Sequence, residues 1–566
     1  MGKVTGAQLL IRSLRAEGVD TLFTLSGTAI LGTYDHCAEE GLRLIDGRHE
    51  SAVVHTAEGY ARAKAEPAVA MVTEGPGHAN AMPGLACAYA EGSPVLLISG
   101  VAHSHGLGSG ANQEIPQVEM AAPITKWSAL VPSAGHIPAY VARAFRHMRT
   151  GEPGPTHLSI PVDRLDEDLV DAEATPILGS RAFGPTAGAG AAPRLVDQAL
   201  LLLAGAKRPL EIAGTTAYWS KAADAVRGLV EATRTPVLTT SRARGLVSDE
   251  HPLCFGGYPY ASERMTELVC NADLVVVLGE KLDLGFVRVL PPGAAIVHVH
   301  PNPAEVGRNR PVAVGIAASV DIAAEQLAEA ARGRAWPKRT GWLGSLERAR
   351  SELDETRREA APGGAPVHPL QVSKALESLL DAESFLVTET SSFAWWSMEH
   401  LEQRRPGRWQ HSTVLWMLGT GIPYALGAKA AFPESRVVLV SGDGSFGFYP
   451  MEFDTAVRHN LPIVAIVGAD EAWGIEQKFQ EARFGEGRLV ATSLRPTRYD
   501  KMIEAMGGHG EHVEQPDELA PALERAFASG KPACINVVTE TALPPSLGAY
   551  VESLKQQQEG LHGRQR

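Results

Sequence analysis

Short runs of apolar, often β-branched residues alternate along almost the whole chain with segments whose apolar residues recur at helical spacing. Early runs include "TLFTLSG" and "SPVLLISG", middle ones "RPLEIAG" and "ADLVVVLGE", and late ones "RVVLVSG" and "LPIVAIVG". Runs without polar interruption are typical of parallel strands that are covered by helices on both faces. The pattern therefore predicts an α/β fold of doubly wound parallel sheets.

Two stretches rich in Gly, Ala and Pro interrupt this alternation. They are "FGPTAGAGAAP" at residues 183–193 and "APGGAPVHP" at residues 361–369. Because such composition is typical of linkers, we expect three doubly wound domains of ordinary size. Their expected limits are residues 1–170, 190–335 and 365–542, followed by a C-terminal tail at residues 543–566.

The tail begins with Pro-Pro and continues as a polar stretch with some helical character. It has two interpretations. It is a frayed terminus, which is common at chain ends, or Tyr550, Val551 and Leu554 form an apolar stripe that docks as a lid. The sequence does not decide between them.

Bulk properties exclude several classes of protein. The net charge of −13 leaves no basic excess to displace counterions, so we expect no nucleic-acid partner. No apolar run reaches the roughly 20 residues that span a bilayer, and the first residues have the pattern of an amphipathic helix rather than a signal peptide. The five cysteines lack Cys-x-x-Cys spacing, which argues against structural zinc and a disulfide framework. We expect a cytoplasmic protein without a membrane segment.

Asp443 and Asp470 each follow a strand pattern, and an amphipathic helix pattern lies between them. Because the carboxyl ends of neighbouring parallel strands meet at one edge, we expect both aspartates on adjacent loops. Gly442 and Gly444 let the backbone turn sharply, and amides of the following helix face the same place. Carboxylate oxygens with amide donors describe a site for Mg²⁺ and a diphosphate.

This stretch resembles the diphosphate-binding signature of thiamine-diphosphate (ThDP) enzymes, which begins Gly-Asp-Gly and ends at Asn-Asn. The resemblance implies that Mg²⁺ is bound by the carboxylates of Asp443 and Asp470 and the carbonyl of Ala472. It also implies that the cofactor contacts Gly442, Gly444 and Ser445. One departure stands out, since "GAD" replaces the Asn-Asn pair and puts a carboxylate where relatives carry an amide.

A second motif near the N-terminus supports the same family. "RHESAVVHTAEGYAR" followed by "VTEGPGHAN" is similar to the pyrimidine-domain signature of acetolactate-synthase-like ThDP enzymes. The resemblance implies that Glu50 contacts N1′ of the cofactor pyrimidine and promotes loss of the C2 proton. It also implies that Thr73, Gly75 and Asn80 lie on the turn that approaches the cofactor. A lone glutamate at a helix start is otherwise explained by the helix dipole.

The stretch "LGTGIPYALGA" matches a loop of the same family. The resemblance implies that Ile422 supports the bent cofactor and that the carbonyl of Thr420 faces its amino group; the alternative for Ile422 is an ordinary core position. In this family the two halves of the cofactor site come from different subunits. The resemblance therefore implies a homodimer or homotetramer that acts on a small-molecule substrate.

The stretch "ANQEIPQVEM" bears on the substrate. Its Gln113 matches a glutamine that lines the reaction centre in relatives, and the variant with Pro most resembles 2-hydroxyacyl-CoA lyases. Ala29 takes the place of the histidine of benzaldehyde lyase, which leaves room for a larger substrate. The middle domain resembles those that hold ADP in CoA-dependent members; the alternative is an empty domain.

Glu476 matches by position an acid/base glutamate of 2-keto acid decarboxylases. In a partly dry pocket it could donate a proton, whereas a glutamate at a helix start is often only a surface residue.

These resemblances imply a ThDP- and Mg²⁺-dependent lyase that cleaves a 2-hydroxyacyl-CoA to formyl-CoA and an aldehyde or ketone. "VTETSSFAWW" departs from the sequence of the CoA-dependent members at that place. The alternative is a 2-keto acid decarboxylase or carboligase of acetolactate-synthase or benzoylformate-decarboxylase type. A third possibility, a non-enzymatic relative, is disfavoured by the intact Glu50.

Overall fold

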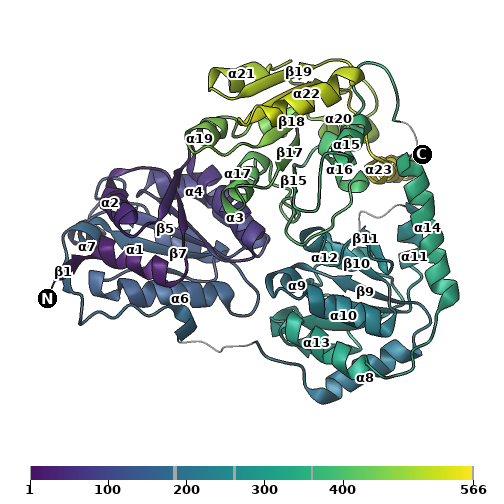
Figure 1. Ribbon diagram of the computed structural model, residues 1–566, viewed down its shortest axis with the longest axis horizontal. Coiled ribbons are helices and arrows are strands. Elements are labelled where there is room, and N and C mark those ends of the chain that lie inside the picture. The colour runs from purple at the N-terminus through teal and green to yellow at the C-terminus, as the bar shows by residue number, and fades with distance from the viewer. Residues whose placement is uncertain (1, 183–187, 259–262, 359–360, 564–566) are drawn as a thin grey trace. The chain divides into compact units, whose positions relative to one another are not determined.

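The computed structural model describes residues 2–182, 188–258, 263–358 and 361–563 (Figure 1). The chain forms two compact units. The first unit consists of Met1–Ala187, Ser412–Glu434 and Tyr449–Leu461, and the second of Gly188–His411, Ser435–Phe448 and Pro462–Arg566. Two segments of the predicted third domain therefore pack with the N-terminal part of the chain. The domain limits themselves stay a prediction, and residues 183–187 of the first predicted linker lie outside the described residues.

The first unit contains a six-stranded parallel sheet. Its strands, in spatial order, are β3 (Arg43–Asp46), β2 (Thr21–Thr24), β4 (Ala68–Val72), β5 (Val95–Val101), β7 (Thr156–Pro161) and β6 (Ser128–Leu130). A short antiparallel pair joins β1 (Lys3–Thr5) to β8 (Leu169–Asp171). The helices of this unit are α1 (Gly6–Ala16), α2 (Leu31–Glu39), α3 (Glu50–Lys64), α4 (Pro76–Ala90), α5 (Gln117–Ala121), α6 (Ile137–Arg149), α7 (Val162–Asp166), α17 (Gly421–Ala431) and α19 (Glu452–Arg458).

Helices α3 and α17 cross at very close range in the first unit. A Cβ atom on Gly59 would lie 2.6 Å from the Cα of Tyr424, and one on Gly427 would lie 2.3 Å from the carbonyl oxygen of Thr56. Only glycine permits such contact between two backbones. Helix α3 is buried along most of its length as a result.

The second unit contains two further six-stranded sheets, both parallel. The middle sheet runs β11 (Cys254–Tyr258), β10 (Val237–Thr240), β9 (Pro209–Ala213), β12 (Leu274–Leu278), β13 (Ala295–His300) and β14 (Val314–Ala317). Its helices are α8 (Pro193–Gly205), α9 (Thr215–Trp219), α10 (Ala223–Thr233), α11 (Glu263–Val269), α12 (Leu284–Val289), α13 (Val320–Ala331) and α14 (Thr340–Arg358).

Strand β12 shows why the middle sheet has uninterrupted apolar strands. Leu274, Val276 and Leu278 belong to one core, while Val275 and Val277 belong to another. Successive side chains of a strand point to opposite faces, so an apolar run is required when helices cover both. Helices α10 and α13 contribute to the first core, and α11 and α14 to the second.

The last sheet runs β16 (Trp409–Gln410), β15 (Phe385–Thr388), β17 (Val437–Gly442), β18 (Val464–Ala469), β20 (Ala533–Val538) and β19 (His509–Val513). Its helices are α15 (Pro369–Glu377), α16 (Ser392–His400), α18 (Asp443–Phe446), α20 (Gly474–Phe484), α21 (Tyr499–Ala505), α22 (Pro516–Ala528) and α23 (Pro545–Gly563). With three parallel α/β sheets, the predicted fold class is confirmed.

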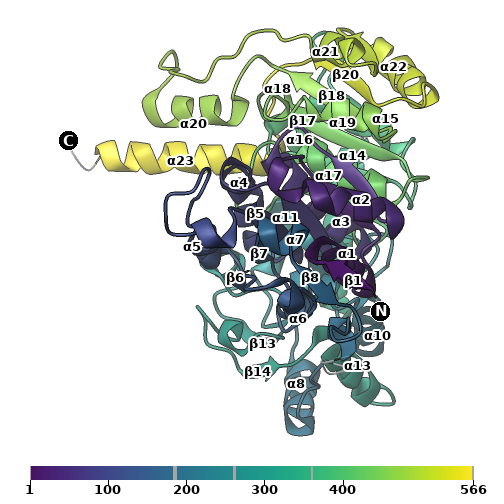
Figure 2. The same ribbon diagram turned by 90° about the vertical axis from the view of Figure 1, so that its left-hand side faces the viewer.

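The tail forms α23, which packs against α20 (Figure 2). The ring centroids of Tyr550 and Phe479 are 5.9 Å apart, and Ser546 Oγ donates to the carboxylate of Glu399 in α16. The described part of the tail is therefore a docked helix. Among the described residues, no helix combines the length and apolarity needed to cross a bilayer.

Candidate active site

The structure brings Asp443 and Asp470 together in the second unit, as the sequence predicts. Strands β17 and β18 pair in parallel with Gly442 opposite Gly468, so the loops after them leave the same sheet edge. Asp443 is 4% exposed; its Oδ1 accepts from Gly444 N at 2.8 Å and its Oδ2 from Glu471 N at 3.0 Å. Backbone amides thus orient this carboxylate.

Burial dominates the electrostatics of this pair. Burial, with the nearby charge of Asp470, raises the pKa of Asp443 to about 7. Burial also raises the pKa of Asp470, although Thr541 Oγ1 donates to its Oδ2 at 2.7 Å. Two partly desolvated carboxylates disfavour being ionised together unless a cation lies between them. Hard oxygen ligands of this kind suit Mg²⁺.

The loop after Asp470 leaves the carbonyl of Ala472 available as a further ligand. Ala472 forms an antiparallel bridge with Ser493, and the flanking bonds are Trp473 N to Thr492 O at 2.9 Å and Leu494 N to Glu471 O at 2.6 Å. In such a non-hydrogen-bonded pair, the facing residues direct their own carbonyls away from the partner strand. The geometry fits the predicted role of Ala472 as a ligand, which stays a prediction.

The Gly-Asp-Gly turn is tightly packed. A Cβ atom on Gly444 would lie 2.7 Å from the indole of Trp473, and one on Gly442 would lie 2.9 Å from Cβ of Ser391. Ser445 Oγ donates to the carbonyl of Thr390 at 3.0 Å. The side chain of Ser445 therefore holds the turn, and the cofactor contacts predicted for Gly442, Gly444 and Ser445 remain untested. The amphipathic helix predicted between the two aspartates is α19, and a separate short helix, α18, begins directly after Gly442.

Glu476 lies in the first turn of α20 and is exposed. The partly dry environment expected for an acid/base residue is not present around this side chain. Its predicted catalytic role therefore remains a hypothesis.

The first unit holds the residues of the second motif. Glu50 begins α3 directly after the turn that follows β3 and is 8% exposed. Asn80 Nδ2 donates to Glu50 Oε2 at 3.1 Å. His49 caps the N-terminus of α3, because its Nδ1 accepts a hydrogen bond from Ser51 N at 3.1 Å. The structure thus brings together two residues that the sequence predicted at one site.

The glycine turn before α4 contacts both glutamines of the "QEIPQ" stretch, Gln113 and Gln117. Gly75 has φ +56°, and a Cβ atom there would lie 2.4 Å from the carbonyl oxygen of Gln113. Gln113 has φ +61°, and its side chain is exposed at the same carboxyl edge of the sheet. Thr73 Oγ1 donates to the carboxylate of Glu74. Gln113 therefore lies beside the turn that contains Thr73 and Gly75, and the predicted roles of all three at the cofactor and substrate stay a prediction.

Sequence reasoning missed Gln117, the second glutamine of that stretch. It is 2% exposed; its Oε1 accepts from Gly75 N at 3.0 Å and its Nε2 donates to the carbonyl of Gly100 at 3.0 Å. Gln117 thereby fixes the turn at Gly75 to strand β5. Its spacing of four residues from Gln113 was visible, but nothing local indicated that it points inward.

Thr420 and Ile422 lie at the start of α17, in the first unit with Glu50. They are 1% and 2% exposed. The carbonyl of Thr420 accepts from Tyr424 N at 2.9 Å, which is the first hydrogen bond of the helix. A carbonyl oxygen has a second lone pair, so the carbonyl of Thr420 can still accept a hydrogen bond from a cofactor. The cofactor contacts of Thr420 and Ile422 stay a prediction.

A buried group of ionisable side chains lies between α3 and α4. Candidate ligand atoms of His55, Glu58 and Cys87 all lie within 4.8 Å of one another. Arg62 Nη1 lies 3.9 Å from the carboxylate of Glu91, which also accepts from backbone amides of residues 413 and 414. Because the cluster already contains the cation of Arg62, we interpret it as a structural contact between helices of the core.

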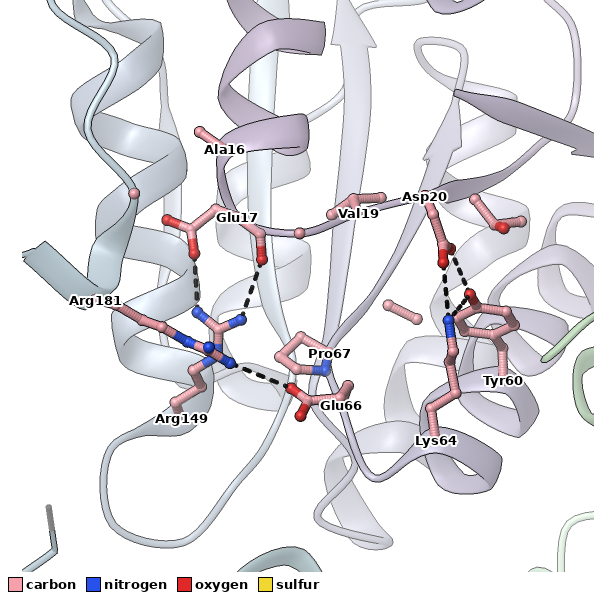
Figure 3. Close-up of a pocket in the computed structure, with 14 residues that line it drawn as sticks. Ala16, Glu17, Val19, Asp20, Tyr60, Lys64, Glu66, Pro67, Arg149 and Arg181 are labelled. Carbon is pink, nitrogen blue, oxygen red and sulfur yellow. Dashed lines mark hydrogen bonds and ion pairs between the residues drawn. The ribbon is translucent and has the colours of Figure 1, made fainter. Parts of the chain in front are cut away.

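A cavity with a volume of about 270 Å³ lies at the opposite edge of the first sheet (Figure 3). It is lined by the starts of β2 and β4, whereas Glu50 and Gly75 follow strand ends. Its charges are already paired: Arg149 lies 2.8 Å from Glu17, and Lys64 lies 2.9 Å from Asp20. This cavity is therefore separate from the candidate active site.

The middle domain shows an internal polar network where the sequence suggested ADP. The carboxylate of Glu280 accepts from Thr215 Oγ1 at 3.2 Å and Thr240 Oγ1 at 2.7 Å, and pairs with Arg242 at 3.2 Å. Burial alone would raise the pKa of Glu280, but Arg242 and these hydrogen bonds lower it. The hydrogen-bond donors of Thr215 and Thr240 at this edge of the middle sheet are already bonded to Glu280. Their arrangement does not support bound ADP.

Comparison with known proteins places both half-sites in one family. Residues 4–120 match the N-terminal TPP binding domain of thiamine pyrophosphate enzymes, residues 196–327 the central domain, and residues 389–537 the C-terminal TPP binding domain.

Curated relatives match over nearly the full length. An acetolactate synthase large subunit of Mycobacterium tuberculosis is 36% identical over 95% of this chain and 96% of its own. A human 2-hydroxyacyl-CoA lyase 2 is 29% identical over 93% and 90%, and a sulfoacetaldehyde acetyltransferase of Alcaligenes xylosoxydans is 29% identical over the same shares. Carboxylate side chains follow strand ends in both half-sites, and the similarity to these relatives covers about 95% of the chain. This protein therefore belongs to the thiamine pyrophosphate enzyme family.

Proposed function

We propose that this ThDP-dependent enzyme is a 2-keto acid decarboxylase or carboligase of acetolactate-synthase type. The observation that carries the proposal is the 36% identity to acetolactate synthases across 95% of the chain. The lyase relative is less similar, at 29%. The alternative considered from the sequence is thus better supported than the CoA-lyase interpretation.

In this proposal each half-site has a distinct task. Asp443, Asp470 and the carbonyl of Ala472 hold Mg²⁺ with the cofactor diphosphate, while Gly442, Gly444 and Ser445 shape the turn around it. Glu50 holds the pyrimidine ring, with Asn80 fixing its carboxylate at 3.1 Å. When bound, ThDP supplies a nucleophilic carbon that attacks a substrate carbonyl and then stabilises the resulting negative charge.

The chain's own residues manage protons and solvent around that chemistry. Gln113, on the loop after β5, and Glu476, in the first turn of α20, are proposed to hold or transfer protons at the substrate. The family resemblance makes a homodimer the smallest functional assembly, because the pyrimidine and diphosphate halves then meet between subunits. Helix α23 is proposed as a cover for the substrate.

A second candidate is the cleavage of 2-hydroxyacyl-CoA to formyl-CoA and a carbonyl compound. It is favoured by "QEIPQVE", which resembles the lyases, and by Ala29, which leaves room near the substrate. It is disfavoured by "VTETSSFAWW", which departs from the CoA-dependent members.

Product analysis separates these candidates. Purified protein with ThDP and Mg²⁺ is given a panel of 2-keto acids and 2-hydroxyacyl-CoAs, and products are identified by mass spectrometry. We expect CO₂ and a 2-hydroxy-keto acid from 2-keto acids. Formyl-CoA as the main product would instead establish the lyase, and protein that binds no ThDP would establish a non-enzymatic relative.

A further inference from the structure

Glu452, the first residue of α19, is a buried carboxylate that contacts the turn before Glu50. It is 1% exposed. Its Oε1 accepts from Arg48 N at 2.9 Å and from His49 N at 3.1 Å. These are the two backbone amides that immediately precede Glu50. Both partners belong to the first unit.

Further contacts from α19 and from the residue that follows it, His459, hold the same turn. Arg458 Nη1 lies 2.6 Å from Asp46 Oδ2, and His459 Nε2 lies 2.7 Å from Asp46 Oδ1. Thr455 Oγ1 donates to Glu452 Oε2 at 2.7 Å and so orients the carboxylate. A Cβ atom on Gly47 would lie 3.3 Å from Glu452 Oε2 and 2.8 Å from Val53. The turn therefore fits closely around one carboxylate.

The physical need for this carboxylate is clear. Amides at the start of a helix have no partner within the helix, and buried amides without partners are costly. A carboxylate also costs much to bury unless donors satisfy it. Glu452 and the two amides satisfy each other, and the hydrogen bonds are charge-assisted. Removal of Glu452 frees the backbone from which Glu50 projects.

We infer that Glu452 is a positioning residue that sets the place of Glu50 at the cofactor pyrimidine. This inference rests on the proposed role of Glu50. Glu452 lies in sequence between Asp443 and Asp470, the two proposed Mg²⁺ ligands. The segment that links these aspartates therefore also positions Glu50 of the same chain. Glu452 itself touches no reacting atom.

Amide hydrogen exchange of the cofactor-free protein tests the contact directly. Glu452→Leu removes the acceptor, and we expect exchange in a peptide spanning residues 46–53 to become at least tenfold faster. Glu452→Gln keeps one acceptor oxygen, so exchange should stay within about threefold of the parent protein. Glu452→Asp, one methylene shorter, should behave like the leucine variant and serves if that variant fails to fold.

Asp454→Ala is the matched control on the same helix. Asp454 lies 3.3 Å from the exposed side chain of Arg48 and 2.8 Å from Arg458, but contacts no amide of the turn. Because Asp454 reaches the turn through the side chains of Arg48 and Arg458, exchange at residues 46–53 should accelerate less than about threefold. Unaltered exchange in the Asp and Leu variants, or equal acceleration by Asp454→Ala, would overturn the inference.

Cofactor measurements distinguish positioning from general support. In Glu452→Asp loaded with ThDP and Mg²⁺, deuterium exchange at cofactor C2 should slow at least tenfold, while the Kd for ThDP changes less than threefold. Glu452→Gln should restore the rate. If the parent protein itself neither binds ThDP nor exchanges C2–H, the proposed function fails while the hydrogen-exchange result still stands. If C2 exchange in Glu452→Asp equals the parent rate, Glu452 does not position Glu50.

Discussion

The two halves of the candidate site satisfy their carboxylates in opposite ways. Glu50 is held by a neutral donor, Asn80, and rests on a turn whose amides are bonded to Glu452. Asp443 instead faces a second carboxylate, and its pKa rises to about 7 because of burial and the charge of Asp470. The first half holds its carboxylate with neutral donors, whereas the second brings two carboxylates together, an arrangement that a cation would stabilise. We therefore expect substitutions in the first to affect chemistry and those in the second to affect cofactor binding.

The largest expected effect concerns Glu50. Glu50→Gln keeps the shape and the contact with Asn80 but removes the charge, so kcat should fall by about 10²–10⁴-fold, the usual contribution of a positioned acid or base. The melting temperature should change little. Steady-state kinetics and thermal melting check this. Substantial remaining turnover would remove Glu50 from the proposed chemistry.

A comparison of the two aspartates tests the electrostatic contrast. Asp443→Asn should weaken Mg²⁺-dependent ThDP binding by about a hundredfold, because a buried, amide-oriented ligand is lost. Asp470→Asn should cost less than about tenfold, since an amide oxygen remains and one repulsive charge is removed. Calorimetric titration with ThDP at fixed Mg²⁺ measures both. Equal losses would show that the two carboxylates are equivalent ligands.

Thr541 provides a smaller test of the same half. Thr541→Val removes the 2.7 Å hydrogen bond to Asp470, and ThDP affinity at limiting Mg²⁺ should fall by roughly tenfold, as for other residues that orient metal ligands. Thr497→Val is the control, because Thr497 is exposed and its hydroxyl donates to the nearby carbonyl of Arg495 at 3.3 Å. An effect from the control as large as that from Thr541→Val would contradict the assignment.

The smallest effect concerns the anchor of the C-terminal helix. Burial raises the pKa of Glu399 from 4.5 to about 7, against hydrogen bonds from Ser546 and the charge of Arg357. A carboxyl with a raised folded-state pKa favours the protonated folded form, so its contribution to stability falls as pH rises from about 4.5 to 7. Glu399→Gln should flatten this slope, with a change in melting temperature of a few degrees. Thermal melts across this pH range decide it; an unchanged slope would show that Glu399 does not titrate there.

Much of the site followed from strand-edge reasoning. The neighbourhood of Asp443 and Asp470 was predictable because each follows a recognisable strand, whereas that of Glu50 and Asn80 followed from the family resemblance. The exposure of Gln113, the inward orientation of Gln117 and the packing of Thr420 and Ile422 with the first unit were not. Those depend on loop backbone geometry and on which elements pack together, and neither leaves a periodic pattern.

The sequence by itself determined the α/β class, the parallel sheets and the family, because apolar strands covered on both faces and glycine-carboxylate turns leave local patterns. Only the tertiary structure decided how the carboxylates are held. Glu452 bonds to the amide of Arg48, 404 positions away along the chain. A hydrogen bond to a distant backbone amide depends on where the folded chain carries that amide, and no residue pattern near either partner records it.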